Sequence, residues 1–185
     1  ERMSEDVFQY KIGQDIYQVD YNHSNGKFTQ KQKIKNKKNL VLCGLHTLYQ
    51  SNMNELLNLK IFLDTDRELI KKWKIERDVN ERGYSLDKVL KQIESREKDY
   101  NEYIIQQKES ADIVIQFYEA NEKLECNFII QNKNINNKII KKIMNLNYEL
   151  NYKNNKFIIK LKNNINELSK NLEHLINKNI NLFKN

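Results

Sequence analysis

Three short apolar runs recur along the first two thirds of the chain, and polar or turn-forming residues follow each of them. They span residues 39–43, 59–63 and 112–117. A continuous apolar run of this length is typical of a strand that is buried on both faces, as in a parallel sheet. Residues 4–12 indicate a helix end, and residues 17–21 alternate like a strand before a turn. We therefore predict three buried strands behind a small N-terminal element.

The stretch between the second and third runs predicts two helices. The first covers residues 68–81, and the residues at 64–66 (Asp-Thr-Asp) supply side chains that can cap its N-terminus. Gly83 marks a break, and Ser85 is the expected N-cap of a second helix over residues 86–111.

An apolar stripe supports the second helix. Its members recur at positions i, i+3, i+4 and i+7, a spacing that places them on one helix face directed at a core. They are Leu86, Val89, Leu90 and Ile93. Because predicted strands alternate with predicted helices, we expect an α/β fold with a parallel sheet.

The C-terminal third has a different pattern. Residues 124–130 and 156–161 read as two further strands, and residues 165–182 as an amphipathic helix. We expect residues 119–185 to form an α+β extension of the domain at residues 1–118.

Composition narrows the class of protein. The chain has 185 residues, the length of one ordinary domain, and a mean hydropathy of −0.83 without a long apolar run, which excludes a membrane span. Two cysteines, Cys43 and Cys126, are too few for a disulfide framework. With no signal peptide in the sequence we expect a cytoplasmic setting, and without an initiator Met we expect a segment of a longer chain.

The positive charge is concentrated in the C-terminal third. The whole chain has 32 Lys and Arg against 25 Asp and Glu; residues 1–118 carry 20 against 19, which leaves 12 against 6 for residues 119–185. That third is rich in Asn, Lys and Ile and has no Arg. Nucleic-acid binding favours cations interleaved with aromatic residues or a known module. We find neither and favour a solvated surface, with a nucleic-acid-binding appendage as the alternative.

The densest polar cluster follows the second apolar run. Arg77 and Asp78 follow Lys74 by three and four residues, and Arg82 follows Asp78 by four, so a helix gathers three cations and one carboxylate on one face. Arg can fork two donors onto one phosphate and Lys adds a point charge, so such a side suits a ligand with several phosphates. On spacing alone, an exposed helix whose charges pair locally is the favoured explanation of the cluster.

Several ordered motifs add to this cluster, and together they resemble the phosphoribulokinase/uridine kinase family over residues 17–117. The phosphoribulokinase branch fits better, because Gly-Leu-His and Gln-Lys are its discriminating residues. The motifs are Tyr21-Asn22-His23 with Gly26, Gly44-Leu45-His46, the lid from Lys74 to Gly83, Ser85-Leu86, and Gln107-Lys108 ahead of Ala111-Asp112.

The resemblance implies a partial P-loop NTPase-like parallel sheet with a helical lid, in a kinase that uses ATP and Mg²⁺. Such a kinase moves phosphate to a hydroxyl of a small acceptor, either a sugar phosphate or a nucleoside. By this resemblance Lys74, Arg77 and Arg82 bind phosphates and Asp78 orients them or the metal. The same resemblance has His23 and Arg96 touch the acceptor. From composition we expect no membrane partner and disfavour nucleic acid as a partner, and oligomerisation is left open.

Two departures from the family pattern set up a rival hypothesis. The sequence has no Gly-x-x-x-x-Gly-Lys-Ser/Thr motif, so we expect this segment alone not to transfer phosphate. Cys43 also occupies the position of the family's carboxylate, and a thiol is a poor ligand for Mg²⁺. We expect Cys43 to be a small buried residue at a strand end. A catalytically impaired pseudokinase or regulatory module is therefore the rival to an active kinase.

Overall fold

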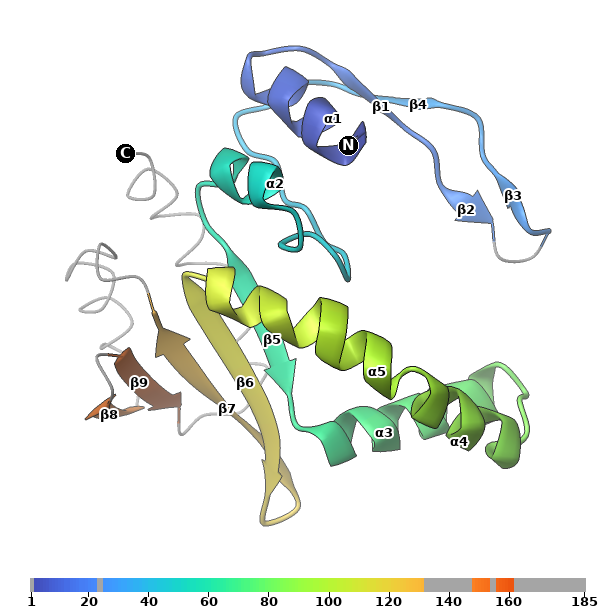
Figure 1. Ribbon diagram of the computed structural model, residues 1–185, viewed down its shortest axis with the longest axis vertical. Coiled ribbons are helices and arrows are strands. Elements are labelled where there is room, and N and C mark those ends of the chain that lie inside the picture. The colour runs from blue at the N-terminus through green and yellow to red at the C-terminus, as the bar shows by residue number, and fades with distance from the viewer. Residues whose placement is uncertain (1, 23–24, 132–147, 154–155, 162–185) are drawn as a thin grey trace. The chain divides into compact units, whose positions relative to one another are not determined.

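The computed structural model describes residues 2–22, 25–131, 148–153 and 156–161 (Figure 1). The chain forms two compact units, residues 1–57 and residues 58–185. No helix among the described residues is both long and apolar enough to cross a membrane.

The first unit combines two helices with two short antiparallel strand pairs. Gly26, at a φ of +69°, makes the turn of the inner pair, in the region that favours glycine. Met53, Val7 and Tyr10 are buried and form the small apolar core. The elements are α1 (Arg2–Lys11), β1 (Ile16–Gln18) paired with β4 (Gln32–Ile34), β2 (Tyr21–Asn22) paired with β3 (Lys27–Phe28), and α2 (Ser51–Leu56).

The first apolar run was predicted wrongly. Residues 39–43 form no strand among the described residues, Val41 is 76% exposed, and Cys43 is exposed rather than buried. An apolar run becomes a buried strand only when neighbouring strands accept its backbone hydrogen bonds, and the described strands supply none here. Hydrophobicity gave no information about that pairing.

The second unit is built on a five-stranded sheet in the order β5-β6-β7-β9-β8. Only β5 and β6 are parallel, so the predicted parallel sheet holds for this pair and the other neighbours are antiparallel. The predicted boundary at residue 118 falls inside β6, and the strands that follow it join the same sheet. The strands are β5 (Ile61–Thr65), β6 (Ile113–Ala120), β7 (Lys123–Ile130), β8 (Tyr148–Lys153) and β9 (Lys156–Leu161).

Helices follow β5 as the sequence predicts, with more breaks than expected. Asp66 caps α3, because its Oδ1 accepts hydrogen bonds from the backbone N–H groups of Glu68 (3.0 Å) and Leu69 (3.3 Å). The predicted helix over residues 86–111 is wrong as one element, since it changes direction at Arg96. The elements are α3 (Arg67–Glu76), a π-helical turn η1 (Arg77–Glu81), α4 (Leu86–Ser95), α5 (Glu97–Asp99), a second π-helical turn η2 (Tyr100–Ile104) and a 3₁₀-helix η3 (Ile105–Ser110).

The apolar stripe of α4 is also less buried than predicted. Val89 is fully buried, whereas Leu86 and Leu90 are exposed. The helix contacts α3, η1 and α5 rather than a broad core, so only Val89 of the stripe is fully covered and Ile93 is half-buried. The apolar periodicity predicted which face of α4 points at its neighbours, but it overestimated how much of that face other elements cover.

The core of the second unit lies along β6 and β7. Val114 and Ile115 from β6 and Phe128 and Ile130 from β7 are buried. Cys126 lies on the same face of β7 as Phe128 and Ile130. Burial raises the pKa of its thiol to about 11, so it is a neutral packing residue. The predicted helix at residues 165–182 lies outside the described residues.

Candidate functional site

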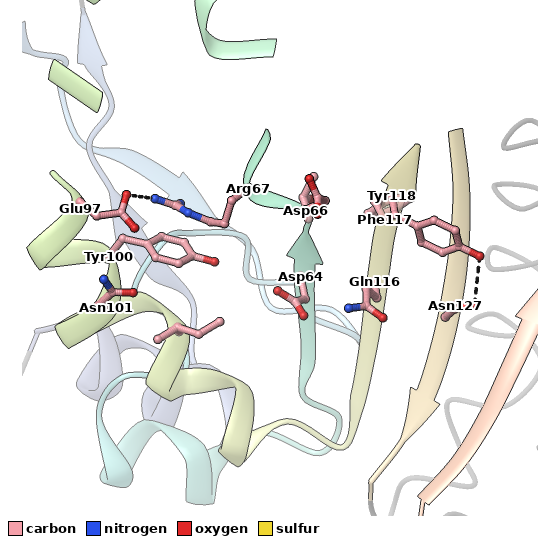
Figure 2. A pocket seen from close by; sticks show the side chains of 12 residues that line it. Asp64, Asp66, Arg67, Glu97, Tyr100, Asn101, Gln116, Phe117, Tyr118 and Asn127 are labelled. Carbon is pink, nitrogen blue, oxygen red and sulfur yellow. Dashed lines mark hydrogen bonds and ion pairs between the residues drawn. The ribbon is translucent and has the colours of Figure 1, made fainter. Parts of the chain in front are cut away.

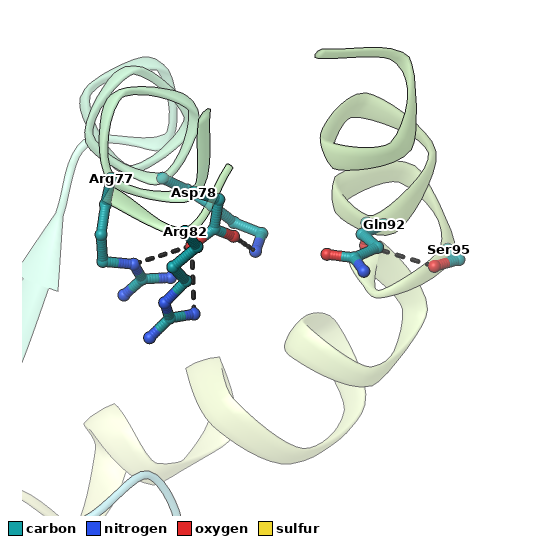
Figure 3. Close-up of polar contacts among 6 residues, drawn as sticks. Arg77, Asp78, Arg82, Gln92 and Ser95 are labelled. Atoms are coloured by element: carbon teal, nitrogen blue, oxygen red, sulfur yellow. Dashed lines mark hydrogen bonds and ion pairs between the residues drawn. The ribbon is translucent and has the colours of Figure 1, made fainter. Parts of the chain in front are cut away.

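The predicted cationic cluster forms around one buried carboxylate (Figure 3). Asp78 lies in η1 and is only 1% exposed. Its Oδ2 accepts a hydrogen bond from Lys74 Nζ at 2.5 Å, and its Oδ1 accepts from Arg77 Nε at 2.9 Å and Arg82 Nη1 at 3.1 Å. We call these four residues the Asp78 cluster. The structure thus brings together four of the six predicted site residues.

The π-helical turn explains why adjacent residues can meet on one carboxylate. Arg77 and Asp78 share the predicted helix face, but as neighbours in sequence they would not contact each other directly on an α-helix. In η1 the backbone widens, with the Arg82 N–H bonded to the Arg77 carbonyl, and both guanidinium groups reach Asp78 Oδ1. Gly83 follows at a φ of +68° and ends the element.

The Asp78 cluster has a net positive charge. Hydrogen bonds from Arg77 and then Lys74 hold the pKa of the Asp78 carboxyl well below its usual range, so it stays ionised. Three cations and one anion give a local charge of about +2. Arg77 and Arg82 are 47% and 51% exposed, so their remaining N–H donors face solvent. Donors held in place by a buried carboxylate are prepared to bind an anion such as phosphate.

The other predicted site residues lie elsewhere. Arg96 is exposed between α4 and α5, and among the described residues its side chain makes no hydrogen bond or ion pair. His23 lies outside the described residues. Contacts of either residue with an acceptor remain predictions.

Neither Asp78 nor Cys43 fits a magnesium ligand in this structure. No group of three or more His, Cys, Asp and Glu side chains comes together among them in a way that could hold a metal ion. Both oxygens of Asp78 are engaged by cations, and Cys43 is an exposed thiol in the first unit. Neither residue offers the free carboxylate oxygens that Mg²⁺ prefers.

A second polar site was missed by sequence reasoning. A pocket of about 510 Å³ opens at the carboxyl ends of β5 and β6, lined by Asp64, Arg67, Tyr100 and Gln116 among others (Figure 2). Arg67 pairs with Glu97 and stacks 3.9 Å from the centre of the Tyr100 ring. The sequence marked residues 64–66 only as a helix cap, because the partners come from distant parts of the chain.

The parallel strand pair, the capped helix and the cationic Asp78 cluster define an α/β protein with a cluster of cations behind its capped helix. Residues 1–123 match the phosphoribulokinase / uridine kinase family, and the chain belongs to this family, as the motifs predicted.

Individual relatives agree with this membership. The chain is 41% identical over 114 residues to the chloroplastic phosphoribulokinase of Spinacia oleracea, which covers 62% of the chain and 28% of that protein. The phosphoribulokinase of Synechocystis sp. is 39% identical over 114 residues, 62% of the chain and 34% of that protein. Uridine-cytidine kinase A of Dictyostelium discoideum is 38% identical over 77 residues, 41% of the chain and 15% of that protein. The chain therefore spans about a third or less of the length of these relatives.

A solved structure supports the fold. The phosphoribulokinase from Rhodobacter spheroides superposes with a TM-score of 0.73 at 20% identity, over 99% of the chain and 73% of that structure. At this identity the likeness concerns the fold alone.

Proposed function

We propose that this chain is the lid-bearing part of an ATP-dependent kinase that transfers phosphate to a hydroxyl of a sugar phosphate or nucleoside. The observation that carries the proposal is the Asp78 cluster, in which three cations are fixed on one buried carboxylate. Membership of a family with phosphoribulokinases and uridine kinases among its members supports the same reaction class. ATP would supply the phosphoryl group, and a cytoplasmic setting stays a prediction.

In this proposal the residues of the lid act on charge and position. Phosphoryl transfer depends mainly on alignment and on stabilising the charge of the phosphate oxygens. Arg77 and Arg82 would donate their solvent-facing N–H groups to those oxygens, and Lys74 would add a third positive charge. Asp78 would act as a positioning residue that fixes the two guanidinium planes before the ligand arrives. Because neither Asp78 nor Cys43 offers free carboxylate oxygens to Mg²⁺, we assign no step to the metal.

Replacing Asp78 by Asn tests this positioning role, because the two explanations predict opposite changes in ATP affinity. The substitution raises the net charge by one, which by Coulomb attraction alone would tighten ATP binding. If Asp78 positions the cations, binding instead weakens by about tenfold, the equivalent of one charge-assisted hydrogen bond. The measurement is calorimetric titration of ATP into the chain and its variants, with thermal melting to confirm folding.

The matched control is Asp87→Asn, which makes the same charge change at an exposed position in the first turn of α4. It should leave ATP affinity unchanged or slightly higher. Tighter binding in both variants, or no ATP binding by the unsubstituted chain, would contradict the proposal.

A catalytically impaired kinase is the second candidate, and the observation that favours it is Cys43. Its thiol is exposed, and by the resemblance it stands at the position of the family's carboxylate. If that lost carboxylate limits catalysis, Cys43→Glu in the full-length protein should raise magnesium-dependent ATP turnover by about 10- to 100-fold. This is the typical cost of disturbing a metal site. Cys43→Gln has the same size without the charge and should give no gain; an equal gain from Gln would argue against the candidate.

A further inference from the structure

Two helices of the second unit, α3 and α4, form a helical hairpin that extends beyond the sheet (Figure 1). The hairpin begins at Arg67, directly after β5, and ends at Ser95, ahead of α5 and η2. We call residues 67–95 the lid hairpin, because they include the Asp78 cluster. Its elements α3, η1 and α4 contact one another and α5 more than they contact the strands. The orientation of the lid hairpin therefore depends on the contacts at its two ends.

The side chain of Arg67 joins these two ends. Its guanidinium forms an ion pair with Glu97 of α5 (Figure 2). The same group lies 3.9 Å from the centre of the ring of Tyr100, the first residue of η2. A planar guanidinium can do both at once, because its N–H donors point outward in the plane while its face stacks on the ring. The start of α3 is thus connected to the segment that follows α4.

The segment that Arg67 contacts is irregular. The helix α5 has three residues, and the π-helical turn η2 follows it directly. Helical turns this short are marginal without contacts from the rest of the protein. Side-chain contacts from outside the segment should therefore contribute much of its local stability.

A second ion pair connects α3 to the sheet without reaching α5. Lys72 Nζ lies 2.9 Å from Glu119 Oε2 of β6. This pair holds one helix of the lid hairpin to a strand and leaves the end of α4 unconnected. It therefore does not replace the Arg67 contact, and it supplies a matched control.

A small rotation at Arg67 would misplace the Asp78 cluster. Arg77 follows Arg67 by ten residues, which is about 15 Å along a helix. A rotation of about 10° at Arg67 would move the cluster by about 2–3 Å, which is more than a hydrogen bond to a phosphate oxygen tolerates. A contact that fixes the two ends of the lid hairpin therefore also fixes the place of the cations.

We propose that Arg67 is a positioning residue, which joins the ends of the lid hairpin and sets the orientation in which the Asp78 cluster meets its ligand. The identity of that ligand as ATP rests on the proposed function. The connection between the hairpin ends does not, because both interactions of Arg67 are with residues of the chain itself.

Amide hydrogen exchange of the 185-residue chain tests the connection without any ligand. Arg67→Ala should raise the exchange rates of residues 97–104 by about 5- to 30-fold, the combined loss of an exposed ion pair and a cation–π contact. Arg67→Lys keeps the charge and loses the planar stacking, so it should give a smaller increase. Lys72→Ala also breaks an ion pair of α3 and should leave these rates unchanged.

Calorimetric titration of ATP into Glu97→Gln tests the consequence for the ligand. Removing a negative charge would tighten ATP binding by Coulomb attraction. Loss of the Arg67 contact should instead weaken it by about three- to tenfold, because the competent orientation is less populated. Glu94→Gln makes the same charge change at an exposed position of α4 and should leave affinity unchanged or slightly higher. The effects of Arg67→Ala and Glu97→Gln should be non-additive, since both break one contact.

Three results would overturn the positioning role. One is unchanged exchange of residues 97–104 in Arg67→Ala, and another is an equal change in Lys72→Ala. The third is equal ATP affinity of Glu97→Gln and Glu94→Gln. If Arg67→Ala lowers the melting temperature, Tyr100→Leu removes the ring alone and should raise the exchange rates by about two- to fivefold. Absence of ATP binding by the unsubstituted chain would contradict the proposed function, and the exchange rates would then decide whether Arg67 joins the hairpin ends.

Discussion

Replacing Phe128 by Ala is expected to lower the free energy of unfolding by about 3–5 kcal/mol, as truncation of a buried aromatic side chain does. Phe128 is 4% exposed and lies on β7, in register with Ile115 of β6 and Ile159 of β9. Small proteins are stable by about 5–15 kcal/mol, so this one change would remove a large part of the total. Urea denaturation followed by circular dichroism measures it.

The matched control is Phe28→Ala, since Phe28 is 72% exposed on β3. Exposed substitutions of this kind usually change stability by less than about 0.5 kcal/mol. Phe128 lies beyond residue 123, where the family match ends, and beyond the predicted boundary at residue 118. A small effect at Phe128 would mean that the strands after residue 118 form an extension that is dispensable for stability. A large effect would make them part of the domain that carries the lid.

The sequence predicted correctly those elements that are determined by residues close together in the chain. The apolar runs that became β5 and β6 and the cap at Asp66 needed only neighbouring residues. The run at residues 39–43 failed because a buried strand also needs partners, which hydrophobicity does not encode. The stripe on α4 failed in the same way, since periodicity gives a direction and not the area that covers it.

The candidate sites likewise differ in whether neighbouring residues or distant segments form them. The Asp78 cluster was predictable because Lys74, Asp78 and Arg82 are four residues apart on successive helical turns. The contact from Arg77 was not, since it depends on the π-helical turn that widens the backbone there. The second pocket was also hidden, because Asp64 and Gln116 meet only through the register of two strands that are far apart in sequence.

The Asp78 cluster gives the largest expected effect on binding. Replacing Arg77 or Arg82 by Ala should each weaken ATP binding by about 10- to 150-fold, the equivalent of 1.5–3 kcal/mol for a charge-assisted and forked contact. Both side chains are held by Asp78 and about half exposed, so they can meet a ligand without rearrangement. Lys72→Ala is the control: Lys72 pairs with Glu119 at 2.9 Å on the surface and should change affinity by less than about fivefold.

The double variant separates a working lid from a charged helix surface. Because Arg77 and Arg82 share Asp78 Oδ1, their effects should be non-additive, with a coupling of about 0.5–3 kcal/mol in a double-mutant cycle on ATP affinity. Repeating the cycle with Asp78→Asn should reduce that coupling, since the shared anchor is gone. Additive, small effects equal to that of Lys72→Ala would mean that the cluster is a solvated helix face with no role in phosphate binding.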